Sequence, residues 1–110
     1  QNGLFEKLSK FSKQGYGVVI GEYAVMLKNG GIKQDTDKFY DNLLDNCDLY
    51  DYCPVLWDCS NFYKRITNTI SDETLAELFS SRAAANEAGK STEEIKAAAK
   101  KKIESTRKTA

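Results

Sequence analysis

The sequence predicts an α/β chain, because two short apolar runs alternate with segments of helical periodicity. The first run, Val18-Val19-Ile20-Gly21-Glu22, is rich in β-branched residues and is typical of a strand buried on both faces of a parallel sheet. The second, Cys53-Pro54-Val55-Leu56-Trp57, opens with a proline, which a strand tolerates at its start. The order helix, strand, loop, helix, strand, loop, helix predicts parallel strands joined by a right-handed crossover.

Three helices are expected around these strands. The first covers residues 4–14 and ends before Gly15; the second begins near Asp35 or Thr36, and the third has Ser71 as its N-cap. Each has apolar residues at helical spacing, which we expect to be buried: Leu4, Leu8 and Phe11 in the first, Phe39, Tyr40, Leu43, Leu44 and Cys47 in the second, and Leu75, Leu78 and Phe79 in the third.

Two polar segments separate or line these elements. Residues 24–34 contain the turn signal Asn29-Gly30-Gly31 and form a long loop after the first strand, where function usually lies. The second helix carries four acidic residues, which we interpret as a solvated face and not as a metal site, because no glycine-bearing calcium loop frames them: Asp37, Asp41, Asp45 and Asp48.

The last quarter of the chain differs in character. Residues 83–110 contain clusters of alanine and lysine, a break at Gly89 and a capping box that starts at Ser91. Only Ile95 and Ile103 are large and apolar there, so we expect a helical tail or linker that buries little surface. A basic tail that binds nucleic acid is the alternative, although no aromatic residues are interleaved with its charges.

Composition excludes several functions. The chain has no histidine, which excludes Ser-His-Asp and Cys-His catalysis and any His-ligated metal site within it. The spacing of Cys47, Cys53 and Cys59 matches no zinc or redox motif, so we interpret them as buried free thiols, while the sequence leaves a Cys47–Cys53 disulfide open. No metal or other cofactor is expected.

The zero net charge gives no reason to expect binding to nucleic acid. No apolar run approaches the ~18 residues that a membrane-spanning helix needs.

Two parallel strands leave two open edges and too little sheet for independent stability. We therefore expect the chain to be part of something larger, with further strands on another segment or polypeptide.

The motifs Phe5-Glu6-Lys7-Leu8, Gly21-Glu22-Tyr23 and Pro54-Val55-Leu56-Trp57-Asp58 carry a resemblance that covers about residues 4–82. In this order and separation, with Phe62 and Arg65 following, they resemble the last quarter of glycoside hydrolase family 5, the (β/α)8-barrel cellulases and related β-glycanases. The resemblance implies that residues 1–82 are the C-terminal βα units, strands seven and eight, of a TIM-barrel catalytic domain, followed by the helical tail of residues 83–110. A complete barrel has about 250 residues.

The resemblance also implies a function. The glutamate that ends strand seven in this family is the catalytic nucleophile, which corresponds to Glu22, and the tryptophan of strand eight lies under the sugar, which corresponds to Trp57. Tyr23 is the aromatic residue that follows the nucleophile and is expected to bind substrate. The expectation is a secreted or extracellular retaining endo-β-1,4-glycanase acting on a β-glucan polysaccharide. Its acid/base residue would lie outside this chain.

Two other functions remain open on the sequence. The first is a small α/β binding or interaction module without catalysis, although no glycine-rich phosphate loop follows a strand. The second is a self-contained hydrolase that pairs Glu22 with Asp58. Side chains alternate along a strand, so Asp58 should point away from the site if Trp57 points into it. Activity of the purified chain alone, or a second polypeptide that co-purifies, would discriminate between them.

Overall fold

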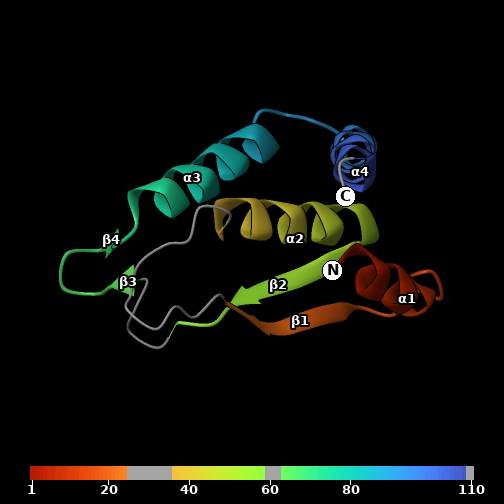
Figure 1. Ribbon diagram of the computed structural model, residues 1–110, viewed down its shortest axis with the longest axis horizontal. Helices are drawn as coiled ribbons and strands as arrows, with labels where there is room; N and C mark the ends of the chain where they lie inside the picture. Colours follow the sequence, from red (N-terminus) through yellow and green to blue (C-terminus); the bar gives the residue numbers. More distant parts are fainter. Residues whose placement is uncertain (25–35, 59–62, 109–110) are drawn as a thin grey trace.

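The computed structural model describes residues 1–24, 36–58 and 63–108 (Figure 1). Within these ranges four helices and two two-stranded sheets confirm the α/β class, while the barrel stays a prediction. The expected turn at Asn29-Gly30-Gly31, the cap candidate Asp35, and Cys59 and Phe62 lie outside the described residues. In chain order the elements are α1 (Asn2–Ser12), β1 (Val18–Tyr23), α2 (Thr36–Tyr50), β2 (Tyr52–Leu56), β3 (Tyr63–Lys64), β4 (Thr69–Ile70), α3 (Glu73–Glu87) and α4 (Thr92–Lys108).

β1 and β2 pair as parallel strands, as the order of elements predicts. Ile20 lies opposite Pro54, and a register shift separates that pair from the next, in which Tyr23 lies opposite Leu56. β2 begins at Tyr52, so its proline lies inside the strand and does not open it. Among the described residues β2 has one neighbouring strand, and an edge strand tolerates proline because its missing N–H need not be paired.

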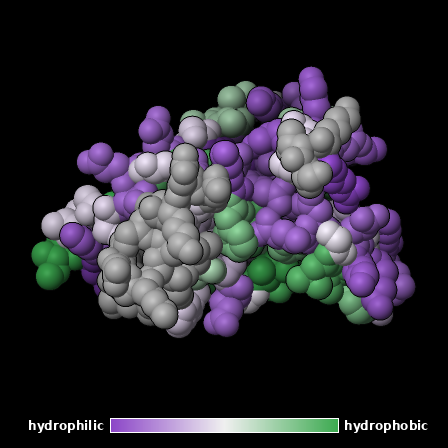
Figure 2. Space-filling model, in the orientation of Figure 1, coloured by the Kyte–Doolittle hydropathy of each residue, from purple (hydrophilic) through white to green (hydrophobic). Residues whose placement is uncertain are grey.

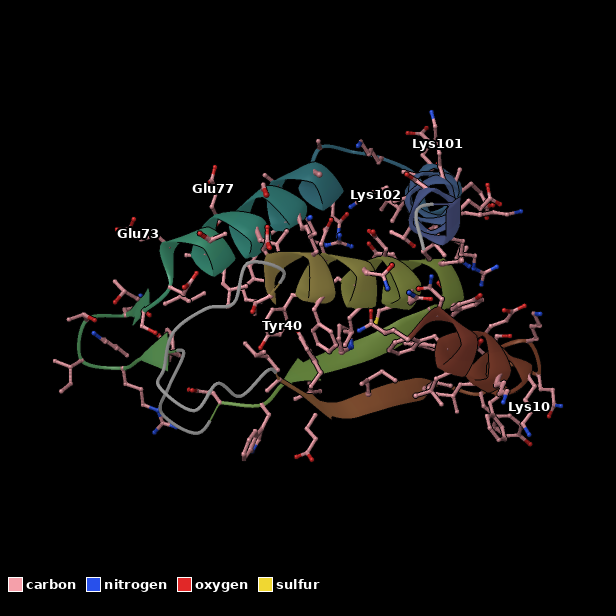
Figure 3. All side chains as sticks on the ribbon, in the orientation of Figure 1. Lys10, Tyr40, Glu73, Glu77, Lys101 and Lys102 are labelled. Atoms are coloured by element: carbon pink, nitrogen blue, oxygen red, sulfur yellow. The ribbon has the colours of Figure 1, made fainter. Side chains whose placement is uncertain are left out.

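The core lies between this sheet and the helices α1 and α2. Its buried cluster consists of Phe5, Leu43, Cys47 and Tyr52. The rings of Phe5 and Tyr52 have centroids 6.0 Å apart, and the Tyr52 hydroxyl donates a hydrogen bond of 2.6 Å to the backbone carbonyl of Phe5. Figure 3 shows Tyr40 pointing from α2 towards the sheet, where it is fully buried. The expected burial of Tyr40, Leu43 and Cys47 is confirmed, whereas Phe39 is 38% exposed and its expected burial is wrong.

The buried side of α1 differs from the predicted one. Leu4 and Phe11 are 62% and 43% exposed, whereas Phe5 and Ser9 are buried. Both sets of residues follow helical spacing, so periodicity alone does not choose between them. The contact of Phe5 with Tyr52, a residue 47 positions later in the chain, fixes the side that faces the core.

One face of the parallel sheet is uncovered. We define the open face as Val19, Cys53, Val55 and Trp57, which alternate with the residues that face α2 and are all exposed. Val19 is 63% exposed and Val55 is 45% exposed. The prediction that β1 is buried on both faces is therefore wrong within the described residues. Figure 1 shows α2 on one side of the sheet and no described element on the other.

α3 begins one residue later than predicted. Asp72, and not Ser71, is the N-cap, because its carboxylate accepts a hydrogen bond of 2.8 Å from the backbone N–H of Leu75. The burial of Leu75 is confirmed at 1% exposure. Between β2 and α3 lies a short β3–β4 hairpin, which the sequence did not predict because each of its strands has two residues.

The prediction that the alanine- and lysine-rich tail buries little is wrong for α4. This helix is seen end-on in Figure 1 and packs against α2 on the side away from the sheet. Ala99 and Ile103 are each 3% exposed. Small alanine side chains let two helices approach closely, so few large residues are needed to form the contact.

Replacing Ile103 with alanine is expected to lower the free energy of unfolding by about 2–3 kcal/mol, because it leaves a cavity between α4 and α2. Urea denaturation of the polypeptide that carries this chain measures the loss. Ile66→Ala is the matched control: Ile66 is 101% exposed, and its replacement should change stability by less than about 0.5 kcal/mol. Equal effects of the two substitutions would contradict the packing of α4.

Candidate functional site

The ends of β1 and β2 place Glu22 and Trp57 on neighbouring segments. Because the strands are parallel, their C-terminal ends lie at the same edge of the sheet (Figure 1). The backbone N–H of Trp57 donates a hydrogen bond of 3.1 Å to the carbonyl of Tyr23, which continues the pairing one residue beyond β2. The residue that follows Glu22 is therefore held directly to Trp57.

Alternation along the strands assigns these side chains to faces. Leu56 and Tyr23 form a pair that is partly buried on the side of α2. Trp57 follows Leu56 and is exposed on the opposite side, the open face. In β1 the register shift between Ile20 and Tyr23 adds one residue, so Gly21 and Glu22 are exposed in succession and Glu22, next to the inward-facing Tyr23, belongs to the open face as well. Trp57 is 43% exposed, so part of this residue is accessible to solvent. An exposed carboxylate and an exposed indole thus share one end of one sheet face.

Tyr23 lies on the other side of the sheet from this pair. Its ring meets Tyr40 edge-on with centroids 5.8 Å apart. Burial, together with Cys47 and Tyr40 nearby, raises the pKa of Tyr23 to about 12, so its hydroxyl stays protonated at neutral pH. The structure therefore brings together Glu22 and Trp57, two of the three predicted site residues, and separates Tyr23 from them.

Glu22 and its neighbour Gly21 are both exposed. A Cβ atom at Gly21 would meet no heavy atom within 4 Å among the described residues. Asp58, which the self-contained hydrolase would use, is also exposed, and alternation sets it on the opposite side from Trp57.

A second charged arrangement lies between α2, α3 and α4, around a pocket of about 260 Å³. The guanidinium of Arg82 contacts Asp41 at 2.7 Å, Asp45 at 2.8 Å and Asp48 at 2.7 Å. Lys102 contacts Asp41 at 2.9 Å and Asp45 at 3.1 Å. Figure 3 shows Lys102 turned towards α2 and Lys101 turned away from it. We call this set, Asp41, Asp45, Asp48, Arg82 and Lys102, the charged cluster.

The charged cluster corrects the interpretation of the acidic residues as a solvated face. The side chain of Asp45 is 5% exposed and that of Arg82 is 17% exposed. Burial works against the charge of Arg82, but the hydrogen bonds that its guanidinium donates to Asp45 and Asp41 raise its pKa. Burial also disfavours the charged form of Asp41. The hydrogen bonds and positive charges of Lys102 and Arg82 outweigh this effect and hold the pKa of that carboxyl below its ordinary value. For Asp48 the loss of water around the buried carboxylate outweighs the attraction of Arg82, so the pKa of this carboxyl is raised.

Sequence reasoning missed this cluster, although a signal existed. Asp41, Asp45 and Asp48 are spaced by four and three residues, so they form one stripe along α2. The basic residues that meet the stripe lie 34 or more positions later in the chain. Because each carboxylate of the cluster contacts a cation, the arrangement joins the three helices α2, α3 and α4 through ion pairs.

The thiols differ from one another. Cys47 and Cys53 are both free, which answers the question of a disulfide between them. Cys47 is buried as predicted. This burial, and to a smaller extent the negative charge of Asp48, raises the pKa of the Cys47 thiol to about 11. Cys53 is exposed on the open face, so the prediction that it is buried is wrong within this chain. The described ranges contain no group of three or more His, Cys, Asp or Glu residues that could hold a metal ion.

Comparisons with known proteins return no relative. No protein-family profile, no curated protein sequence and no solved structure matches the chain. Among the described helices, none combines the length and the apolar character that crossing a membrane requires.

Proposed function

We propose that this chain supplies the nucleophile of a retaining endo-β-1,4-glycanase that acts on β-glucan-type polysaccharides. The observation that carries the proposal is the shared position of Glu22 and Trp57. Both are exposed on the same face, at the C-terminal ends of adjacent parallel strands that a hydrogen bond of 3.1 Å ties together. In α/β enzymes built on parallel strands, this end of the sheet carries the catalytic residues.

The two residue types suit this chemistry. A retaining glycosidase needs an ionised carboxylate that attacks the anomeric carbon and a second carboxyl about 5–5.5 Å away that protonates the leaving oxygen. Glu22, at the end of a strand, would keep the attack geometry that a mobile loop would lose. The exposed indole of Trp57 offers an apolar surface against the C–H face of a pyranose ring. The acid/base carboxyl would come from outside this chain.

The open face supports a completed barrel. In a (β/α)8 barrel, helices cover the outside of the strands and branched side chains fill the inside. Here α2 covers one side of β1 and β2, while Val19 and Val55 point to the other and are exposed. Parallel sheets are ordinarily covered on both faces, so further strands would bury this one. The whole enzyme would act outside the cell, where polymeric β-glucan is found.

Alkylation of Cys53 tests this completion. Cys53 is exposed on the open face of the chain alone, and the proposed barrel interior would cover it. In the native enzyme that carries this chain, iodoacetamide at pH 8 should therefore modify Cys53 at least tenfold more slowly than in the denatured protein, as mass spectrometry of the peptides can measure. Cys47 is the internal control, because it is buried within the chain itself.

Rapid modification of Cys53 in the native, active enzyme would contradict the covered face. The assignment of Glu22 is tested separately. A mechanism-based inhibitor that forms a stable ester with the nucleophile must attach to Glu22 and to no other residue.

A further inference from the structure

The β3–β4 hairpin extends beyond the end of the sheet that carries Glu22 and Trp57. Figure 1 shows it on the side to which the arrows of β1 and β2 point. Tyr63 pairs with Ile70 and Lys64 with Thr69 in an antiparallel ladder. Asn68 has a φ of 55°, a left-handed conformation that asparagine tolerates and that reverses the chain. β4 leads directly into α3 and contacts it.

The hairpin presents an aromatic side chain that its neighbours hold in place. Tyr63 is 40% exposed, and its hydroxyl donates a hydrogen bond to the side-chain oxygen of Asn68. The hydroxyls of Thr67 and Thr69 lie 2.7 Å apart on the same hairpin. Figure 2 shows a hydrophobic tip at the end of the molecule where the hairpin turns, and Ile66 there is 101% exposed. An exposed ring edged by hydroxyl and amide groups is a surface that suits a sugar, which has an apolar C–H face and a polar rim.

The hairpin is within reach of the proposed catalytic centre. Tyr63 follows Trp57 by six positions, and a chain of this length spans at most about 20 Å. A polymer that places one sugar over Trp57 extends in both directions from it, so a neighbouring sugar can reach the hairpin. The exposed part of one tyrosine is too small for a stable protein interface, which buries roughly 1,200 Å² or more.

We propose that Tyr63 forms a distal subsite for the β-glucan chain, in which its ring stacks against a sugar several units from the bond that is cleaved. The inference rests on the proposed function and adds a residue that governs the preference for long substrates. Tyr63 is a specificity-determining residue here and takes no part in bond cleavage. The hydrogen bond with Asn68 fixes its ring, so that less side-chain freedom is lost on binding.

The test compares Tyr63→Ala with Tyr63→Phe in the complete enzyme that carries this chain. Steady-state kinetics are measured on a soluble polymeric β-glucan and on a short aryl cellobioside. Tyr63→Ala is expected to raise KM for the polymer about threefold to tenfold, and KM for the short substrate much less. Tyr63→Phe keeps the ring but loses the hydrogen bond to Asn68, so it should raise KM for the polymer less than Tyr63→Ala does. Tyr16→Ala is the matched control, because Tyr16 is 65% exposed and precedes β1, at the other end of the sheet.

A binding measurement without turnover supports the kinetics. In the Glu22→Gln enzyme, affinity electrophoresis in gels with soluble β-glucan should show weaker retardation when Tyr63 is also replaced by alanine. If the wild type cleaves the polymer and Tyr63→Ala behaves as the wild type does in both assays, the subsite is wrong and the proposed function stands. If the wild type cleaves no β-glycan, the proposed function fails and the subsite with it.

Discussion

Replacing Glu22 with glutamine is expected to lower the turnover of the complete enzyme on β-glucan by several orders of magnitude. Glutamine keeps the size and shape of the side chain but lacks the anion that attacks the anomeric carbon, so the covalent step is lost. Glu22 is exposed at the end of β1 and has no structural contact that the substitution would break among the described residues. Melting temperature should therefore stay within a few degrees of the wild type. Release of reducing sugar measures the loss of turnover.

Glu77→Gln is the matched control for this prediction. Glu77 is exposed on α3, and Figure 3 shows it pointing away from α2 and the sheet. Its replacement removes the same charge from the chain and should leave turnover unchanged. Retention of full activity by Glu22→Gln, or an equal loss in both variants, would contradict the assignment of the nucleophile.

Covalent labelling tests the assignment of Glu22 as the nucleophile without a mutation. A 2-deoxy-2-fluoro β-glycoside with a good leaving group should form a glycosyl ester that hydrolyses slowly, because the fluorine destabilises the oxocarbenium-like transition state of the second step. Peptide mapping by mass spectrometry locates the label, which should lie on Glu22. A label on another residue would show that the motif assignment is wrong, and hydrolysis of β-glycans without any label would count against the retaining mechanism.

Replacing Arg82 with methionine is expected to lower the free energy of unfolding by about 3 kcal/mol. Methionine keeps most of the aliphatic stem of arginine but removes the guanidinium that contacts Asp41, Asp45 and Asp48 within 2.8 Å. Three carboxylates would then lie close together, with Lys102 still in contact with Asp41 and Asp45, while Asp48 loses its ion pair with Arg82. Chemical denaturation of the polypeptide that carries this chain, followed by circular dichroism, measures the loss.

Two further variants show whether the loss comes from unpaired buried charge. Arg107→Met removes a more exposed pair, in which the side chains of Arg107 and Glu6 are 50% and 61% exposed, and should cost less than about 1 kcal/mol. Adding Asp45→Asn to Arg82→Met should recover part of the stability, because it removes one repelling carboxylate. A loss for Arg82→Met no larger than that for Arg107→Met would contradict the role of the charged cluster.

The sequence by itself determined the parallel strands β1 and β2, the helices around them, and their order, but not the short β3–β4 hairpin. β-branched residues at 18–20 predicted β1, helical spacing predicted α2, and the alternation of the two predicted parallel pairing. Parallel pairing in turn predicted that the residues ending the two strands, Glu22 and Trp57, lie at one edge of the sheet. These features depend on neighbours in the chain and on the general geometry of parallel strands, so local pattern was enough to predict them.

The tertiary structure alone decided which sides of these elements are covered. α1 buries Phe5 and not Leu4, because Tyr52 of a later strand meets that side. The acidic stripe of α2 is partly buried and not solvated, because Arg82 and the distant helix α4 lie against it. Both outcomes result from contacts between residues tens of positions apart, and the periodicity of a segment carries no information about its partner. A helix or strand specifies that it has an apolar or charged side, while packing in three dimensions selects what that side meets.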